Sequence, residues 1–250
     1  MDAARCQLSI IVPAFNEERR LPACLRSIHA AWADLQEQDA LDACHYELVV
    51  ADNNSTDATS RVAAEFGARV VFEPINQISR ARNAGAAAAR GQWLLFLDAD
   101  SSLHPATLAD LIVAIASGRY AGGGCRIGLD SAPWWGAAAV EFWNLTARVA
   151  RLASGSFLFC RHDAFRELGC FSHELYASED LEFSRRLKRW GKAHGLKFAM
   201  LSAQPHISSG RKLDLYSHRE IAGHFWRALV LAPYTTRRRQ MLDFFYDGRR

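Results

Sequence analysis

The 250-residue sequence has no apolar run long enough to cross a bilayer. Its longest candidates, LADLIVAIASG and WWGAAAVEFWNLTARVA, are too short or carry charge. The first residues, MDAARCQLSIIVPAF, reach their apolar run without the basic start, long apolar core and cleavage site of a signal peptide. We therefore expect a cytoplasmic protein.

The sequence also lacks closely spaced cysteine pairs, a strong net charge and internal repeats. The six cysteines are widely spaced and form no C-x-x-C pair, which excludes a zinc knuckle or a redox motif and predicts that most are small buried side chains. A net charge of +3 argues against general binding of nucleic acid. The charge is uneven, because residues 201–250 hold nine Lys and Arg against four Asp and Glu.

Apolar runs alternate with helical patterns along the chain, which predicts a mostly parallel α/β sheet with helices on both faces. The expected strands are 8–15, 46–51, 68–72, 93–97, a glycine-rich strand from 120, 155–161, 197–200 and 205–208. The expected helices start near 18 and cover 58–66, 78–89, 105–117, 134–152, 162–169, 178–191 and 213–231.

Polar clusters follow three of these strands. Asn16 and Glu17 come after the first strand, residues 52–57 after the second, and Asp98 and Asp100 after WLLFL. Loops and helix N-termini converge at the carboxyl ends of parallel strands, so a ligand site is expected there. Asp98 and Asp100 point the same way if the chain stays extended, an arrangement that favours a cation between them; the alternative is a turn that closes the strand.

Four motifs in order identify the chain as similar to family 2 glycosyltransferases with the GT-A fold. They are SIIVPAFNEE, ELVVADNNSTDAT, ARNAGAAAARGQWLLFLDAD and GSFLFCRHDAFRELGCFSHELYASEDLEFSRRL. The resemblance covers about residues 1–210 and implies one Rossmann-like domain. Residues 1–103 would bind a nucleotide-sugar, residues 104–210 the acceptor, and residues 211–250 would form a basic helical extension.

The resemblance also implies roles for individual residues. Asp52 would accept the N3 hydrogen of a uracil, although Asn53 and Asn54 replace the commoner DDGSTD pattern and leave the base open, and a turn cap is the alternative. Arg82 is read as part of a solvated helix face. The positions expected to bind the nucleotide-sugar are Pro13, Phe15, Asn16, Glu17, Asp52, Arg80, Asn83, Asp98 and Arg211.

A divalent cation, Mg²⁺ or Mn²⁺, is the implied cofactor. Asp100 would ligate it directly, Asp98 would contact the ion or the ribose, and His206 is a third candidate, unless His206 is only hydrogen-bonded. Ser208, Ser209 and Arg211 would contact the diphosphate or cap a helix.

Asp180, with Glu179 beside it, matches the base of the family. Such a base takes the proton of an acceptor hydroxyl in an inverting single displacement, and burial would raise its pKa toward a useful range. The alternative is that acidic residues in a first helical turn stabilise the helix dipole.

The acceptor stays open between a sugar, a lipid-linked molecule and a small molecule. Trp134, Trp135 and Trp143 would form an apolar or sugar-stacking wall, or fill a core. The basic C-terminal helix would lie on the inner face of the membrane, face solvent, or make a dimer contact.

Two other functions compete with transfer from a UDP-sugar. A nucleotidyltransferase that makes nucleotide-sugars normally has a glycine-rich phosphate loop after its first strand, and PAFNEERR has none. A non-catalytic nucleotide-sugar-binding protein of the same fold would not need Asp98, Asp100 and Asp180.

Overall fold

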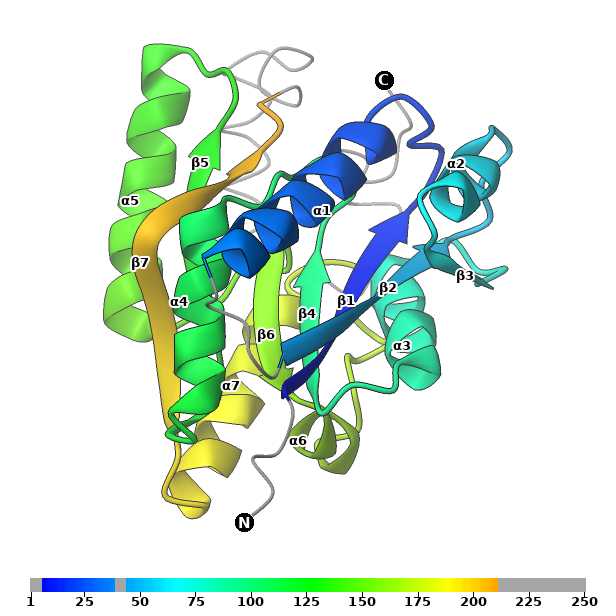
Figure 1. The fold of residues 1–250 in the computed structure, drawn as a ribbon. Helices are drawn as coiled ribbons and strands as arrows, with labels where there is room; N and C mark the ends of the chain where they lie inside the picture. Colours follow the sequence, from blue (N-terminus) through cyan, green and yellow to red (C-terminus); the bar gives the residue numbers. More distant parts are fainter. Residues whose placement is uncertain (1–5, 39–43, 211–250) are drawn as a thin grey trace.

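The computed structural model describes residues 6–38 and 44–210 and shows a central sheet with helices on both faces (Figure 1). The strands are β1 Cys6–Ala14, β2 Cys44–Asp52, β3 Arg69–Phe72, β4 Trp93–Leu97, β5 Tyr120–Leu129, β6 Phe157–Arg161 and β7 Lys197–Ser208. The helices are α1 Leu21–Glu37, α2 Thr59–Glu65, α3 Ile78–Ala88, α4 Pro105–Ala116, α5 Trp134–Ala150, α6 His162–Glu167 and α7 Glu179–Ala193. The helix expected over 213–231 and Arg211 lie outside the described residues.

The seven strands form one sheet in the order β3-β2-β1-β4-β6-β5-β7. The first four strands are parallel, and β7 is parallel to β5, which confirms the predicted mostly parallel sheet. The exception is β6, which runs antiparallel to both β4 and β5. Its first residue, Phe157, therefore lies beside Leu97 at the carboxyl end of β4.

The strand order reverses between β1 and β4, and the two strands separate at their carboxyl ends. The last β1–β4 pair is Ile11 with Phe96, whereas β1 stays paired with β2 as far as Ala14. Pro13 lies just beyond the point where β4 leaves, where its missing N–H costs the sheet no hydrogen bond. A ligand crevice is expected at such a switch point.

Alternation along the strands sends apolar side chains into two cores. Ile10 and Val12 belong to the cluster under α1, α2 and α4, and Ile11 belongs to the cluster under α3, α6 and α7. Burying each such side chain stabilises the fold by about 1.5–3 kcal/mol. The two layers hold the carboxyl ends of β1, β2 and β4 at one edge.

The sequence predicts that another group lies close to the backbone of the glycine-rich strand, and the glycines of β5 show which groups these are. A Cβ at Gly122 would lie 2.3 Å from the carbonyl oxygen of Phe159, and one at Gly123 would lie 2.3 Å from that of Ala199. The approaching groups are therefore the neighbouring strands.

The two strands expected near 197–200 and 205–208 are one strand, β7. Its register with β5 shifts between the Cys125–Leu201 and Ile127–His206 pairs, so the residues around Pro205 bulge out of the ladder. Pro205 thus interrupts pairing without ending the strand.

Cys24, Cys125 and Cys160 are buried free thiols, as predicted, and Cys170 is a half-buried free thiol. Cys44 differs because it is disulfide-bonded. Within 6–38 and 44–210, no helix has both the length and the apolar character that crossing a bilayer requires.

Candidate active site

The loop after β1 and the loop after β2 are joined by hydrogen bonds. Asn16 has a left-handed backbone, with φ of 51°. Its N–H donates to Ser55 Oγ at 2.9 Å, and its Oδ1 accepts from the N–H of Thr56 at 2.6 Å. The N–H of Glu17 donates to Thr59 Oγ1 at 2.8 Å. These contacts fix the position of both loops at the switch point, while Pro13 is buried in β1 and Phe15 is half-buried.

Asp52, the last residue of β2, is only 4% exposed. Its Oδ1 accepts from the N–H of Ser55 at 2.9 Å, and its Oδ2 accepts from the hydroxyl of Ser60. The structure thus shows the turn-capping role. Contact with a base stays a prediction, because each carboxylate oxygen has a second lone pair.

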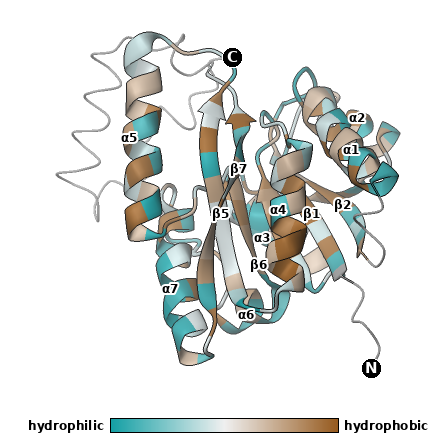
Figure 2. Cartoon of the chain, turned by 60° about the vertical axis from the view of Figure 1, so that its left-hand side comes forward, coloured by the Kyte–Doolittle hydropathy of each residue, from teal (hydrophilic) through white to brown (hydrophobic). Residues whose placement is uncertain are grey.

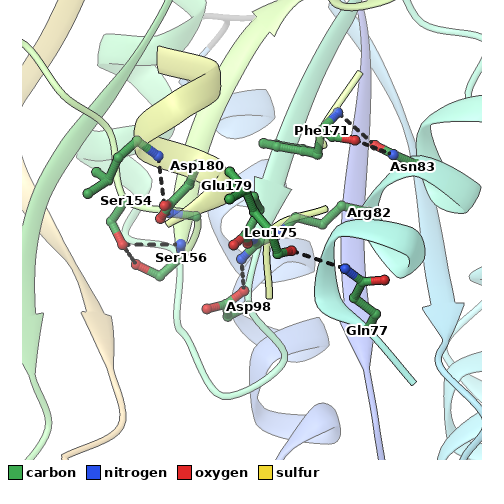
Figure 3. Close-up of polar contacts among 12 residues, drawn as sticks. Gln77, Arg82, Asn83, Asp98, Ser154, Ser156, Phe171, Leu175, Glu179 and Asp180 are labelled. Carbon is green, nitrogen blue, oxygen red and sulfur yellow. Dashed lines mark hydrogen bonds and ion pairs between the residues drawn. The ribbon is translucent and has the colours of Figure 1, made fainter. Parts of the chain in front are cut away.

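Two amide side chains connect the loops after β2 and β3 to the segment before α7. Asn53 Oδ1 accepts from the N–H of Gln77 at 2.9 Å. Gln77 Nε2 donates to the carbonyl oxygens of His173 and Leu175 at 2.8 and 3.0 Å (Figure 3). Sequence reasoning missed Gln77, which is 1% exposed and positions the segment that leads to the candidate base.

Asn83, six residues after Gln77 and within α3, makes a similar clamp. Its Nδ2 donates to the carbonyl oxygen of Phe171 at 2.9 Å, and its Oδ1 accepts from the N–H of Phe171 at 3.0 Å. Arg80 donates from Nε to Gln77 Oε1 at 3.1 Å. Asn83 is therefore occupied by the protein backbone, and nucleotide contact by Arg80 and Asn83 stays a prediction.

Arg82 is at the centre of the site, although the sequence reading left it on a solvated face. It is 4% exposed. Its Nη1 donates to Glu179 Oε1 at 2.5 Å and its Nη2 to Asp98 Oδ1 at 3.0 Å (Figure 3). A Cβ on Gly155 would lie 2.4 Å from Nη2, so a larger residue there would have to displace the guanidinium from its present position. One buried cation therefore connects the end of β4 with the start of α7.

The signal for this burial was present in α3. Ser79, Arg82, Gly85 and Ala86 follow the i, i+3, i+4 spacing of one helix face, and all four are buried. Gly85 packs so closely that a Cβ would lie 2.5 Å from Ile11 Cγ2. Because the small residues of this face let α3 approach the sheet closely, Arg82 on the same face is buried with them.

Asp180 lies beside this pair. Its Oδ2 accepts from the N–H of Gly155 at 2.6 Å, and its Oδ1 accepts from the N–H of Leu181 at 2.7 Å. Burial raises the pKa of Asp180, in the direction expected for a base, and raises the pKa of Glu179 to about 7 although the Arg82 guanidinium opposes that shift. Glu179 is 3% exposed and serves as the partner of Arg82.

Three carboxylates share the one guanidinium. Burial lowers the pKa of Arg82, but the charges of Asp98, Glu179 and Asp180 raise it further, and the net change is a rise. Fully ionised, this group carries more negative than positive charge in a poorly solvated place, which is unfavourable unless a proton or cation offsets it. The local charge therefore favours a cation.

The chain does not stay extended after β4, because the N–H of Ser101 donates to the carbonyl oxygen of Asp98 at 3.0 Å and closes a turn, the alternative expected from the sequence. Asp98 and Asp100 still offer the carboxylate oxygens that a hard divalent ion prefers. Asp98 and Asp100 are both half-buried at the end of β4, and their charges, together with burial, raise the pKa of the nearby Cys24 thiol. In the described ranges no three His, Cys, Asp or Glu side chains converge as ligands. Mg²⁺-type sites generally use one or two carboxylates and take their other ligands from phosphates and water, so ligation by Asp98 and Asp100 stays a prediction.

His206 is fully buried in β7 with hydrogen bonds to both ring nitrogens. Nε2 lies 2.9 Å from Ser156 Oγ, and Nδ1 lies 3.1 Å from the carbonyl oxygen of Arg126. Burial lowers the pKa of His206 to about 4, so the ring is neutral. Metal ligation stays a prediction and would require the ion to replace Ser156.

Ser209, which follows β7, accepts a hydrogen bond through Oγ from Arg20 Nη1 at 2.6 Å.

The tryptophan segment forms α5, where Trp134 is 84% exposed and Trp143 is half-buried. Trp134 does not fill a core.

The sequence model of glycosyl transferase family 2 matches residues 9–169, which is more than half of the chain, and the chain belongs to this family. It is 34% identical over 145 residues to an uncharacterised glycosyltransferase of Mycobacterium tuberculosis, covering 56% of this chain and 60% of that protein. It is 32% identical over 109 residues to the human dolichyl-phosphate beta-glucosyltransferase, covering 40% of this chain and 33% of that protein. The chain thus spans 60% of the length of its mycobacterial relative.

Solved structures confirm the predicted GT-A fold. S. aureus TarS in complex with UDP-GlcNAc superposes with a TM-score of 0.63 at 20% identity, over 82% of this chain and 59% of that one. Glucosyl-3-phosphoglycerate synthase from Mycobacterium tuberculosis, in complex with Mn²⁺ and UDP-glucose, gives a TM-score of 0.61 at 19% identity, over 94% of this chain and 80% of that one. At such identities the likeness concerns the fold.

Proposed function

We propose that this chain transfers a sugar from a nucleoside-diphosphate sugar, a UDP-sugar, to an acceptor hydroxyl with inversion at the anomeric carbon. Membership of glycosyl transferase family 2 and structural relatives that hold UDP-sugars support the reaction class. The observation that carries the proposal is the Arg82 guanidinium, which binds Asp98 of the expected donor side and Glu179 of the expected acceptor side.

Residues 1–103 would hold the donor. Asp52 and the joined loops around Asn16 would bind the nucleoside, and Asp98 and Asp100 would hold Mg²⁺ or Mn²⁺. When bound, the divalent ion supplies Lewis-acid stabilisation of the departing diphosphate. The nucleotide would enter at the switch point, where β1 and β4 stop pairing and where Asn16, Asp52, Asp98 and Asp100 end or follow their strands.

Residues 104–210 would hold the acceptor and supply the base. Asp180 would take the hydroxyl proton while the new bond between the acceptor oxygen and the anomeric carbon forms and the bond to the diphosphate oxygen breaks. Its raised pKa matches this role, and the N–H of Gly155 orients the carboxylate. Glu179 and Arg82 would position the base.

The test has two stages. A thermal-shift screen of nucleotide-sugars with and without Mn²⁺ selects the donor, because a ligand that binds the folded state raises the melting temperature. The selected donor is then incubated with the protein and Mn²⁺, with Asp180→Asn as the matched control. Proton NMR follows the anomeric configuration of the sugar that is first released to water.

Release of a nucleoside diphosphate with inverted sugar supports the proposal. Retention of configuration would contradict a single displacement. Formation of pyrophosphate would identify a nucleotidyltransferase, and tight binding without turnover would identify a binding protein.

A further inference from the structure

Helix α5 is attached to the sheet by a narrow face of small residues. Its buried positions are Gly136, Asn144 and Ala147. Asn144 clamps the backbone of β5, because its Oδ1 accepts from the N–H of Ile127 and its Nδ2 donates to the carbonyl oxygen of Ile127, both at 2.9 Å. Asn144 therefore anchors the helix through its side-chain amide, and among the large apolar side chains of α5 only Trp135, Val140 and Trp143 are half-buried.

Four other large apolar side chains of α5 are exposed to solvent. Trp134, Phe142, Leu145 and Val149 are 84%, 73%, 60% and 78% exposed. At 3.6 residues per turn the four fall within an arc of about 80° on one side of the helix. We call these four residues the outer face of α5. An apolar stripe of this kind on a surface marks an interaction site.

A group of basic side chains adjoins the C-terminal end of α5. Arg148 and Arg151 come from α5 and its C-cap, and Arg185 and Lys188 come from α7, which lies below that end in Figure 2. Lys188 Nζ donates to the carbonyl oxygen of Ala150 at 2.5 Å. Burial and the charges of Arg185 and Arg151 lower the pKa of Lys188, so the charges are close together. We call these four residues the cationic cluster.

The cationic cluster is uncompensated within the described ranges. None of its four members forms an ion pair with a carboxylate there, whereas Glu141, the acidic residue of α5, pairs with Arg126. An apolar stripe beside unpaired positive charge is the composition of surfaces that lie in the headgroup region of an anionic bilayer.

We propose that the outer face of α5 and the cationic cluster dock this chain on an anionic lipid surface. The apolar side chains would enter the boundary between headgroups and acyl chains, and the basic side chains would contact lipid phosphates. Charge argues against two other occupants. Residues 211–250 hold nine Lys and Arg against four Asp and Glu, so this segment would be repelled by the cationic cluster, and a second copy packed in parallel against the outer face of α5 would bring two such clusters together.

The docking surface goes beyond the proposed reaction and does not depend on it. The chain runs directly from the end of α5 to Gly155, whose N–H donates to the Asp180 carboxylate. The candidate base would then be close to the bilayer, within reach of an acceptor carried on a lipid.

Co-sedimentation of the full chain with vesicles tests the proposal. We expect binding to vesicles of equal parts phosphatidylglycerol and phosphatidylcholine, no binding to phosphatidylcholine alone, and weaker binding at high salt. The double variant Phe142→Ser/Val149→Ser should reduce partitioning by about tenfold. Its matched control, Phe72→Ser/Val113→Ser, removes two apolar side chains that are exposed elsewhere and should leave partitioning unchanged.

Charge is tested separately. Arg151→Gln/Arg185→Gln should weaken partitioning roughly 30-fold, since each basic residue at an anionic surface contributes about 1 kcal/mol. Arg61→Gln/Arg90→Gln, on exposed arginines elsewhere, should have no effect. Circular dichroism confirms that every variant is folded.

Three results would overturn the proposal. The first is absence of binding to anionic vesicles. The second is binding that the α5 variants leave intact and that Arg237→Gln/Arg238→Gln/Arg239→Gln removes. The third is a dimer that Phe142→Ser/Val149→Ser converts to a monomer, without vesicle binding. Because vesicle binding is measured without a donor, its failure is distinct from a failure of the proposed transfer.

Discussion

A half-buried carboxylate, Glu47, and a group of three carboxylates around Arg82 lie at opposite ends of the sheet, and their charges are balanced differently. At the amino end of β4, Glu47 accepts from Ser9 Oγ at 2.6 Å and from the N–H of Arg90 at 2.5 Å, and it pairs with Arg69. Burial raises the pKa of Glu47, but these donors outweigh burial and the net pKa is lowered. At the carboxyl end, three carboxylates share Arg82, and burial raises the pKa of Glu179 and Asp180.

We infer from this difference that Glu47 is a structural carboxylate and that the carboxylates around Arg82 are the reactive ones. One carboxylate with matched donors stabilises the fold and needs nothing further. Several carboxylates with one cation keep a tendency to bind a proton or a metal ion, which is what the proposed base and metal site require. The predictions below test this contrast.

The largest effect is expected for Asp180→Asn. Removing a general base lowers transfer by about 10²- to 10⁴-fold, while donor binding measured by calorimetry should be unchanged. Glu47→Gln, at the other end of the sheet, is the matched control and should keep the wild-type rate. Substantial transfer by Asp180→Asn would show that another group takes the proton.

Next in size is the effect of Arg82→Met on stability. It leaves buried carboxylates without their cation, and we expect the free energy of unfolding to fall by about 3–5 kcal/mol at neutral pH. The variant raises the pKa values of Glu179 and Asp180 further, so its folded state binds protons more tightly than its unfolded state. The loss should therefore be smaller at acidic pH and grow as pH rises.

Urea denaturation at several pH values checks this prediction. Arg69→Met is the control at the satisfied end of the sheet, where Arg69 is half-exposed and the loss should be small. A loss for Arg82→Met that does not depend on pH would mean that excess negative charge is not the cause.

Asp100→Ala should weaken donor binding where Mn²⁺ is present, by about 10- to 100-fold, the range seen when metal-site residues are lost. Binding without Mn²⁺ should change little. Asp34→Ala, on α1, is the matched control. Calorimetry with UDP measures both affinities, and equal affinities with Mn²⁺ would count against Asp100 as a ligand.

The smallest effect is expected for Glu47→Gln. A carboxyl whose folded pKa is lowered stabilises the fold above its unfolded pKa, and this contribution disappears as pH falls through the folded pKa. We therefore expect a loss of about 1 kcal/mol at neutral pH that vanishes in acid. Urea denaturation at neutral and acidic pH measures it, and a loss that persists in acid would point to packing.

The sequence predicted the elements well where local pattern decides them. The strand Trp93–Leu97 has the predicted bounds, and α3 ends one residue early. The reversed direction of β6 was not predictable, because a helix between two strands normally returns the chain for a parallel pair, and the direction of a short apolar run leaves no mark in its residues.

The sequence predicted that the carboxylates belong to one site, a role that stays a prediction, and it missed the residues that hold them. Asp98 and Asp180 stand in recognisable motifs, and the structure brings both next to Arg82. Arg82 was missed because an arginine on a helix is normally solvated, and its burial here depends on Gly155, which lies in a distant segment. Gln77 was missed for a related reason, since its partners are backbone carbonyls of another loop.

We propose that the carboxylates at the end of β4 hold a divalent ion together with the donor diphosphate. Anomalous diffraction from a crystal soaked with UDP and Mn²⁺ tests this proposal most directly. We expect a manganese peak within ligand distance of Asp100, next to Asp98 and bridged to the diphosphate. A diphosphate bound elsewhere, or a well-bound nucleotide with no manganese beside these two carboxylates, would contradict it.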